Sequence, residues 1–376
     1  MCFARSSDIP DLVDDVALTD ESHGPPDVPL DVDVTGTNGC PPTSEQSPGP
    51  EDNSPRDFSS ISGVSHNVRT LGSAAEKRDE IVQLMDNHNT SLLLLQSTGL
   101  RADNTDGQEC DPLHLAESYP NHLFFDHYVS QEKKKVAGGV SIVLGPHGKS
   151  AWEKAGKPDP IRGGIIAHTA RVIGLELHFF DNANNLLKVF AVSFYMPPST
   201  SSHTDADYDA TIDALDAVLQ KRPNDAVLYM GGDINGAMGV ASDDADLHDS
   251  PLGRHGVAHT NDRGLRFLEF MQRDQLGQGP ICSVGTYFKK KKHGTWRHAP
   301  TDTWYQHDHI FTLRKDLKRF KGFCYVSNVD SDHTAVRAQM RLAVFIPRKK
   351  NSKGGKHTRI QKKKKADRDP IGDVDG

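Results

Sequence analysis

The stretch that most constrains this chain is residues 228–239, LYMGGDINGAMG. A short apolar run enters a glycine pair, and Asp233 and Asn235 follow. This order is typical of a buried strand at its carboxyl end, where α/β folds place ligands. Asp233 and Asn235 are two positions apart, so an extended backbone would point both side chains to one face. Taken alone, the stretch is more typical of an ordinary Asp-Ile-Asn-Gly turn.

The chain around this strand alternates short apolar runs with turns. Helical spacing of apolar residues predicts helices at 74–88, 206–222 and 264–274. Apolar or alternating runs predict strands at 66–72, 90–98, 122–129, 138–146, 170–180, 187–197, 282–288, 305–313, 322–328 and 333–345. Many strands, few helices and mostly hairpin connections predict an α/β fold of two packed, mostly antiparallel β-sheets flanked by helices, a four-layer α/β sandwich.

The two ends differ in composition from the middle. Residues 1–60 hold 13 acids and two bases among many Pro, Ser, Asp and Gly residues, so we expect a disordered acidic arm. Residues 348–368 hold 11 Lys or Arg and one acid, so we expect 348–376 to be a basic disordered tail. The folded domain is therefore expected to span 61–347.

The cysteines and the apolar runs bear on the compartment. The five cysteines (Cys2, Cys40, Cys110, Cys282 and Cys324) are widely scattered and show no zinc-binding spacing. Unpaired thiols in a reducing compartment fit this pattern. No apolar run reaches the length of a membrane span, and the N-terminus does not have the layout of a signal peptide. We expect an intracellular, soluble protein, with the nucleus as one location.

Polar residues stand at the ends of several predicted strands. Each has an ordinary structural role open to it, such as the helix or strand cap that Ser331-Asp332-His333 could form. Their order along the chain carries more information, because a two-sheet sandwich gathers strand ends into one cleft. In chain order these residues are Asn67, Tyr195, Asp233, Asn235, Asp308, Asp332 and His333.

This order resembles the endonuclease/exonuclease/phosphatase superfamily, and most closely the endonuclease domains of non-LTR retrotransposons and their craniofacial-development-protein-like relatives. The resemblance covers about residues 64–346. GGDING (231–236) and SDHTAV (331–336) are its most specific matches to the superfamily. TYF, TWRHAP and QHDH, within 286–309, are the most specific matches to the retrotransposon branch.

The resemblance implies catalytic roles. Asp233 would orient or deprotonate the attacking water, and Asn235 would hold the phosphate. His333, paired with Asp308, would bind the scissile phosphate and stabilise its developing charge. Tyr195 would contact the phosphate or the leaving oxygen. Phosphodiester cleavage needs such a positioned water and positive charge near the equatorial oxygens.

The resemblance also implies a metal site, with one departure from the family pattern. Asn67 and Asp332 would help to hold Mg²⁺, for which Mn²⁺ is an alternative, and no organic cofactor is expected. The usual ligand, a Glu in a Q-E-T motif, is replaced in Q-S-T at 96–98 by Ser97. A neutral hydroxyl is a poorer Mg²⁺ ligand than a carboxylate. We therefore expect weak metal binding and slow turnover. Ser97→Glu should raise the activity.

Three functions remain open at this point. The leading one is metal-dependent hydrolysis of DNA phosphodiesters by a retroelement-type endonuclease, with DNA or another nucleic acid as the partner and the basic tail as an added contact. The second is a catalytically inactive nucleic-acid-binding relic of that domain, disabled at Ser97. The third is a phosphatase acting on a small phosphoester or phospholipid.

Asp103, Asp106 and Glu109 are candidates to supply the carboxylate that is missing at Ser97. The sequence does not indicate an oligomeric state.

Overall fold

The computed structural model describes residues 59–71, 75–100, 115, 117–127, 138–166, 169–200, 203–274, 277–291, 293–326 and 331–343. All of them belong to the compact unit Gly39–Gly376. The expected N-terminal arm, apart from its last two residues, and the basic tail lie outside the described residues. So do Asp103, Asp106 and Glu109.

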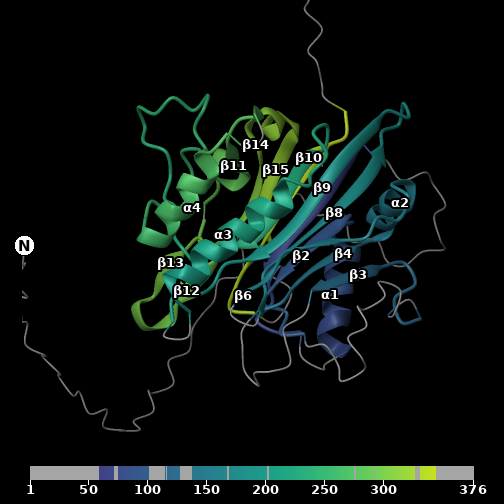
Figure 1. The fold of residues 1–376 in the computed structure, drawn as a ribbon, viewed down its shortest axis with the longest axis horizontal. Coiled ribbons are helices and arrows are strands. Elements are labelled where there is room, and N and C mark those ends of the chain that lie inside the picture. Colours follow the sequence, from purple (N-terminus) through teal and green to yellow (C-terminus); the bar gives the residue numbers. More distant parts are fainter. Residues whose placement is uncertain are drawn as a thin grey trace, which may run out of the picture. The chain divides into compact units, whose positions relative to one another are not determined.

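Two six-stranded sheets form the domain (Figure 1). The first has the order β15-β16-β1-β2-β4-β3, with bounds β1 Ser60–Asn67, β2 Leu92–Gln96, β3 Leu123–His127, β4 Val140–Leu144, β15 Phe320–Val326 and β16 Ala335–Arg341. The second has the order β11-β14-β10-β9-β8-β5, with bounds β5 Ile161–Arg162, β8 Val172–Phe180, β9 Leu186–Tyr195, β10 Val227–Asp233, β11 Ile281–Ser283 and β14 Asp308–Leu313.

Helices and two small hairpins complete the fold. The α-helices are α1 Ala75–Asn87, α2 Pro146–Lys154, α3 Asp205–Leu219 and α4 Asp262–Gln272, and the 3₁₀ helices are Val284–Tyr287, Ala299–Thr301 and Arg314–Arg319. The hairpins pair β6 Ile165–Ile166 with β7 Thr169–Ala170, and β12 Trp296–His298 with β13 Thr303–Tyr305. Among the described residues, no helix is long and apolar enough to cross a membrane.

Each large sheet contains a single parallel pair. β1 and β2 run parallel and are joined through α1, and β9 and β10 run parallel and are joined through α3. The other pairs in both sheets are antiparallel. The prediction of two mostly antiparallel sheets is therefore confirmed. A parallel pair brings two carboxyl ends to one edge of a sheet, and this fold has two such pairs.

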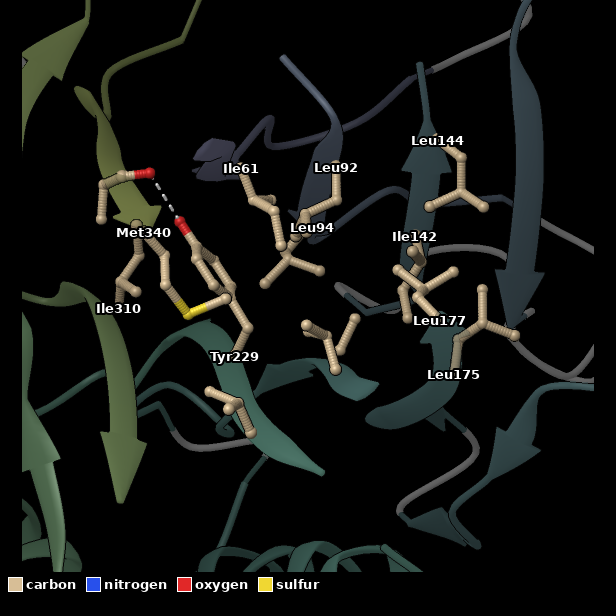
Figure 2. Packing of buried hydrophobic residues seen from close by; sticks show 14 of the residues in the cluster. Ile61, Leu92, Leu94, Ile142, Leu144, Leu175, Leu177, Tyr229, Ile310 and Met340 are labelled. Atoms are coloured by element: carbon tan, nitrogen blue, oxygen red, sulfur yellow. Dashed lines mark hydrogen bonds between the residues drawn. The ribbon is translucent and has the colours of Figure 1, made fainter. Parts of the chain in front are cut away.

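Three apolar clusters hold the layers together. The largest fills the space between the sheets, where Ile61, Leu94 and Leu175 lie with Tyr229 (Figure 2). The Tyr229 hydroxyl crosses this core and donates to the carbonyl of Ala338, 3.0 Å away. The second cluster packs α3 and α4 on the outer face of one sheet, and the third packs α1 on the outer face of the other. Each buried large apolar side chain contributes about 1.5–3 kcal/mol.

Two strand predictions are partly wrong. The strand expected at 66–72 is β1, which begins at Ser60 and ends at Asn67. It stops there because the Asn67 side chain accepts the Arg69 N–H at 3.0 Å in a local turn, and Arg69 has φ +59°. The strand expected at 282–288 ends at Ser283 and becomes a 3₁₀ helix, in which the Thr286 hydroxyl bonds back to the Ser283 carbonyl.

The expectation of unpaired thiols is also wrong for one cysteine. Cys324, on β15, is disulfide-bonded. Cys282, on β11, is a free and buried thiol, and burial raises its pKa to about 11. The other three cysteines lie outside the described residues.

Candidate active site

A cavity of about 340 Å³ opens where the carboxyl ends of the two parallel strand pairs meet. Of the residues predicted from the sequence, Asn67, Ser97, Tyr195, Asn235, Asp332 and His333 line it. The other two, Asp233 and Asp308, are fully buried and bonded to residues of the lining. The structure therefore brings all eight predicted site residues together.

Asp233 is the last residue of β10 and the centre of the site. The sheet pairs it with Tyr195 on one side and with Asp308 on the other. One carboxylate oxygen accepts the Asn67 side-chain amide at 2.7 Å, and the other accepts the backbone N–H of Asn235 at 2.8 Å. Two donors on opposite oxygens fix the plane of the carboxylate, so Asp233 is held ready to orient a small polar molecule.

Asn235 follows Asp233 in a backbone conformation with φ +43°. Its side-chain amide donates to the carbonyl of Met196 at 2.8 Å, which fixes the side chain at the cavity wall. The loop after β10 is held from outside by α4. An added Cβ at Gly264 would lie 1.8 Å from the carbonyl oxygen of Ala237, so only glycine permits this close approach.

Asp308 and His333 form a buried ion pair beside Asp233. The Nδ1 atom of His333 lies 2.8 Å from an Asp308 carboxylate oxygen. Burial alone would lower the pKa of His333, but the charge and hydrogen bond of Asp308, assisted by Asp233, raise it to about 9. Burial raises the pKa of Asp308, and the charge of His333 opposes that rise. At neutral pH the imidazole is therefore a cation.

Tyr195 ends β9 at the cavity wall. Burial raises the pKa of its phenol, and the charge of Asp233 adds to the rise. Hydrogen bonds with Asn235 and Ser97 oppose it only in part. The Arg171 guanidinium carbon lies 5.0 Å from the centre of the Tyr195 ring. Tyr195 is therefore a neutral hydroxyl group at neutral pH, able to donate a hydrogen bond into the cavity.

The three residues expected to hold a metal all contact Arg69. The Asn67 side-chain oxygen accepts the Arg69 backbone N–H, and the Ser97 hydroxyl donates to the Arg69 carbonyl at 3.3 Å. The third residue, Asp332, places one carboxylate oxygen 3.5 Å from Nε of Arg69. Its other oxygen accepts the indole N–H of Trp296 at 3.2 Å. The three oxygen-bearing side chains are thus bonded to the protein itself.

Among the described residues, this arrangement does not fit Mg²⁺. That ion requires hard oxygen ligands near octahedral geometry, usually with one or two carboxylates. Asp332 is the only carboxylate of the three, and a guanidinium lies against it. Ligand atoms of Asp233, Asp308 and His333 do lie within 4.8 Å of one another, a grouping that could hold a metal ion. The protonated imidazole, however, has no lone pair to offer.

Three cavity residues, Arg69, Trp296 and His307, received no role from the sequence. Trp296 and His307 line the cavity, with ring centres 5.4 Å apart. Both lie in stretches that carried the family resemblance, TWRHAP and QHDH, so the motifs signalled the place but not the function. Thr295, the first residue of TWRHAP, also received no role. Its hydroxyl accepts the backbone N–H groups of His307 and Asp308, which positions the start of β14.

Comparison with known proteins supports the fold. No family model and no curated protein matches the sequence. Among solved structures, the AP endonuclease LMAP from Leishmania major gives a TM-score of 0.54 at 15% identity, over 76% of this chain and 88% of that one. The catalytic domain of APE2 from Xenopus laevis gives 0.51 at 14% identity, over 75% and 92%. These two likenesses confirm the predicted α/β fold of two packed sheets flanked by helices.

The retrotransposon branch is also represented among the similar structures. The endonuclease domain of TRAS1, a telomere-specific non-LTR retrotransposon, gives a TM-score of 0.46 at 14% identity, over 75% of this chain and 99% of that domain.

Proposed function

We propose that this cleft binds a nucleic-acid phosphodiester and hydrolyses it. One observation carries the proposal. The oriented Asp233 carboxylate lies within 4.8 Å of the Asp308–His333 ion pair, at the cavity of about 340 Å³. A base for water and a cation for phosphate oxygens are the two groups that hydrolysis of a phosphodiester requires.

The reaction is an in-line displacement by water. Asp233 accepts a proton from the water as its oxygen bonds to phosphorus, and the bond from phosphorus to the leaving oxygen breaks. His333 faces the equatorial oxygens with positive charge, and the Asn235 amide helps to place the phosphate. The neutral Tyr195 hydroxyl donates toward the leaving oxygen, which takes its proton from solvent. Each positioned proton-transfer group contributes about 10²–10⁴-fold in such reactions.

Mg²⁺ or Mn²⁺ remains an expectation of the family resemblance. If a cation binds, it would supply positive charge at the phosphate, with Asp332 and Asn67 among the oxygen-bearing side chains that line the cavity. No step above depends on it, because the side chains expected to hold it are bonded to Arg69.

DNA is the substrate that we favour. The sequence supplies 11 Lys or Arg in the tail 348–368, which suits a polyanion larger than a small ester. Trp296 and His307 offer half-buried ring faces on which a base could stack. A retroelement-type endonuclease therefore remains our leading hypothesis.

A substrate panel tests the reaction class. We expect the full chain to hydrolyse bis(4-nitrophenyl) phosphate, a diester, faster than 4-nitrophenyl phosphate, a monoester, and to nick supercoiled plasmid. Asp233→Asn should remove diester hydrolysis while leaving the protein folded. Faster monoester hydrolysis would instead support the phosphatase function.

A second candidate is the inactive nucleic-acid-binding relic. The observation that favours it is the absence of a carboxylate at Ser97, whose hydroxyl is instead bonded to Arg69. DNA binding by the full chain without hydrolysis of any ester, in Mg²⁺, Mn²⁺ or EDTA, would establish it.

An intracellular location, the nucleus included, follows if DNA is the substrate. The disulfide at Cys324 bears on this expectation, because disulfides persist mainly in oxidising compartments. Imaging of a tagged full chain, with a marker for the nucleus, would decide between these locations.

A further inference from the structure

Arg69 contacts each of the three residues expected to hold a metal ion. Its backbone N–H and carbonyl bond to Asn67 and Ser97, and its Nε faces Asp332. These are the three residues that the family resemblance assigns to the cation. A single residue therefore contacts all three side chains, and it brings a permanent positive charge of its own.

The backbone of Arg69 has an unusual conformation. Its φ of +59° lies in the left-handed region, which is unfavourable for a long side chain without compensation. The turn formed by Asn67 and the hydroxyl of Ser97 supply that compensation on both sides of the residue. Ser97 is itself left-handed, with φ +55°. Two strained residues thus meet at the cavity rim, a place where strain is commonly functional.

The guanidinium remains accessible. The Arg69 side chain is 66% exposed and lines the same cavity as His333. Asp332 contacts Nε, at 3.5 Å, and within the described part of the chain no hydrogen bond of the two terminal nitrogens is found. Those nitrogens form the planar fork that matches two oxygens of one phosphate. The indole N–H of Trp296 donates to the other oxygen of Asp332, so the carboxylate beside the guanidinium is itself held in place.

We propose that Arg69 replaces the divalent cation as the group that binds the phosphate, so that this cleft binds a nucleic-acid phosphodiester without a metal. The inference rests on the proposed function, because it concerns the same phosphate in the same cavity. It assigns the loss of the carboxylate at Ser97 to a change of binding chemistry, from a metal ion to a guanidinium.

A binding measurement tests this directly. The probe is a fluorescein-labelled duplex with phosphorothioate linkages, titrated with the full chain in EDTA and in Mg²⁺ at equal ionic strength. We expect the wild-type Kd to be the same in both buffers within about twofold. Arg69→Gln should weaken binding roughly 10- to 100-fold in both, the loss typical of a charged hydrogen bond. Arg69→Lys keeps the charge but not the planar fork of the guanidinium. Its Kd should lie between those of the wild type and Arg69→Gln.

Arg341→Gln is the matched control. Arg341 is exposed at the far end of β16, where it pairs with Ser60 at the opposite end of β1 from Asn67. Like Arg69→Gln, the Arg341→Gln variant loses one positive charge, and its affinity for the duplex should equal that of the wild type. The basic tail is present in every variant, so the difference between Arg69→Gln and Arg341→Gln isolates the cleft.

Two results would overturn the inference. One is wild-type binding at least tenfold tighter in Mg²⁺ than in EDTA, a comparison that needs no variant. The other is an Arg69→Gln protein that is folded and binds like Arg341→Gln.

Diester hydrolysis, measured in the same buffers, separates this inference from the proposed function. Metal-independent binding through Arg69 without hydrolysis would refute the function alone. Binding that requires Mg²⁺, together with hydrolysis that requires Asp233, would refute the inference alone.

Discussion

The ion pair between Asp308 and His333 makes a quantitative prediction for Asp308→Asn. In the native site the pKa of His333 is raised from 6.5 to about 9, although burial by itself would lower it. Asparagine keeps the size of the side chain at position 308 and removes its charge. Burial should then prevail, and His333 should titrate near or below its ordinary pKa. At pH 7.5 the variant would hold a neutral imidazole where the wild type holds a cation.

The magnitude follows from the pKa change. A rise from 6.5 to about 9 corresponds to roughly 3 kcal/mol of stability. Because the pKa is raised in the folded state, this contribution is complete below pH 6.5 and is lost as pH rises through about 9. Asp308→Asn should therefore cost most stability near pH 6, and the difference from the wild type should shrink toward pH 10.

Two measurements check this prediction. Histidine side-chain NMR over pH 5–10, with His333→Gln to assign the signal, gives the pKa directly. Denaturant unfolding of wild type and Asp308→Asn at pH 6.5 and 9.5 gives the energies, and taking the difference between the proteins removes other titrating groups. A wild-type His333 that is neutral by pH 7 would show that Asp308 does not raise the pKa of His333. So would an equal loss of stability at both pH values.

Three other outcomes are expected. Contrary to the expectation from the family pattern, Ser97→Glu alone should form an ion pair with Arg69 and leave activity low, whereas Ser97→Glu combined with Arg69→Gln should make plasmid nicking respond to Mg²⁺; nicking restored by Ser97→Glu alone would contradict this. Truncation after Pro347 should flatten the dependence of DNA affinity on salt, measured by anisotropy, and an unchanged slope would exclude the tail as a contact. Gly264→Ala should cost about 1–3 kcal/mol by overpacking, whereas Gly164→Ala, which meets no atom within 4 Å, should be neutral in thermal unfolding.

The sequence predicted the architecture well, because hydrophobic period and turn residues report local structure. The expected helix at 74–88 is α1, and the organising strand is β10, which ends at Asp233 as its glycine-acid pattern indicated. Predictions failed where a contact at short range redirected the backbone. β1 ends at Asn67 because that side chain caps its own turn, and apolar alternation carries no sign of such a bond.

The site was predicted as a set of residues but not as a set of contacts. The hydrogen bond between Asn67 and Asp233 joins positions 166 residues apart, and it exists only because β1 and β10 end side by side in facing sheets. The sequence also placed Asn67, Ser97 and Asp332 around a metal. It could not show that Arg69, in the same turn, would bond to all three, because that depends on two left-handed backbone conformations.

Nicking of supercoiled plasmid by wild type and Asp233→Asn tests whether this cleft hydrolyses phosphodiesters with Asp233 as the base. Both proteins are assayed as full chains, purified in parallel, in EDTA and in Mg²⁺. The account predicts slow conversion to the nicked form by the wild type in at least one buffer, and a loss of about 100-fold or more in Asp233→Asn. Equal nicking by the two proteins, or none by the wild type in either buffer, would contradict it.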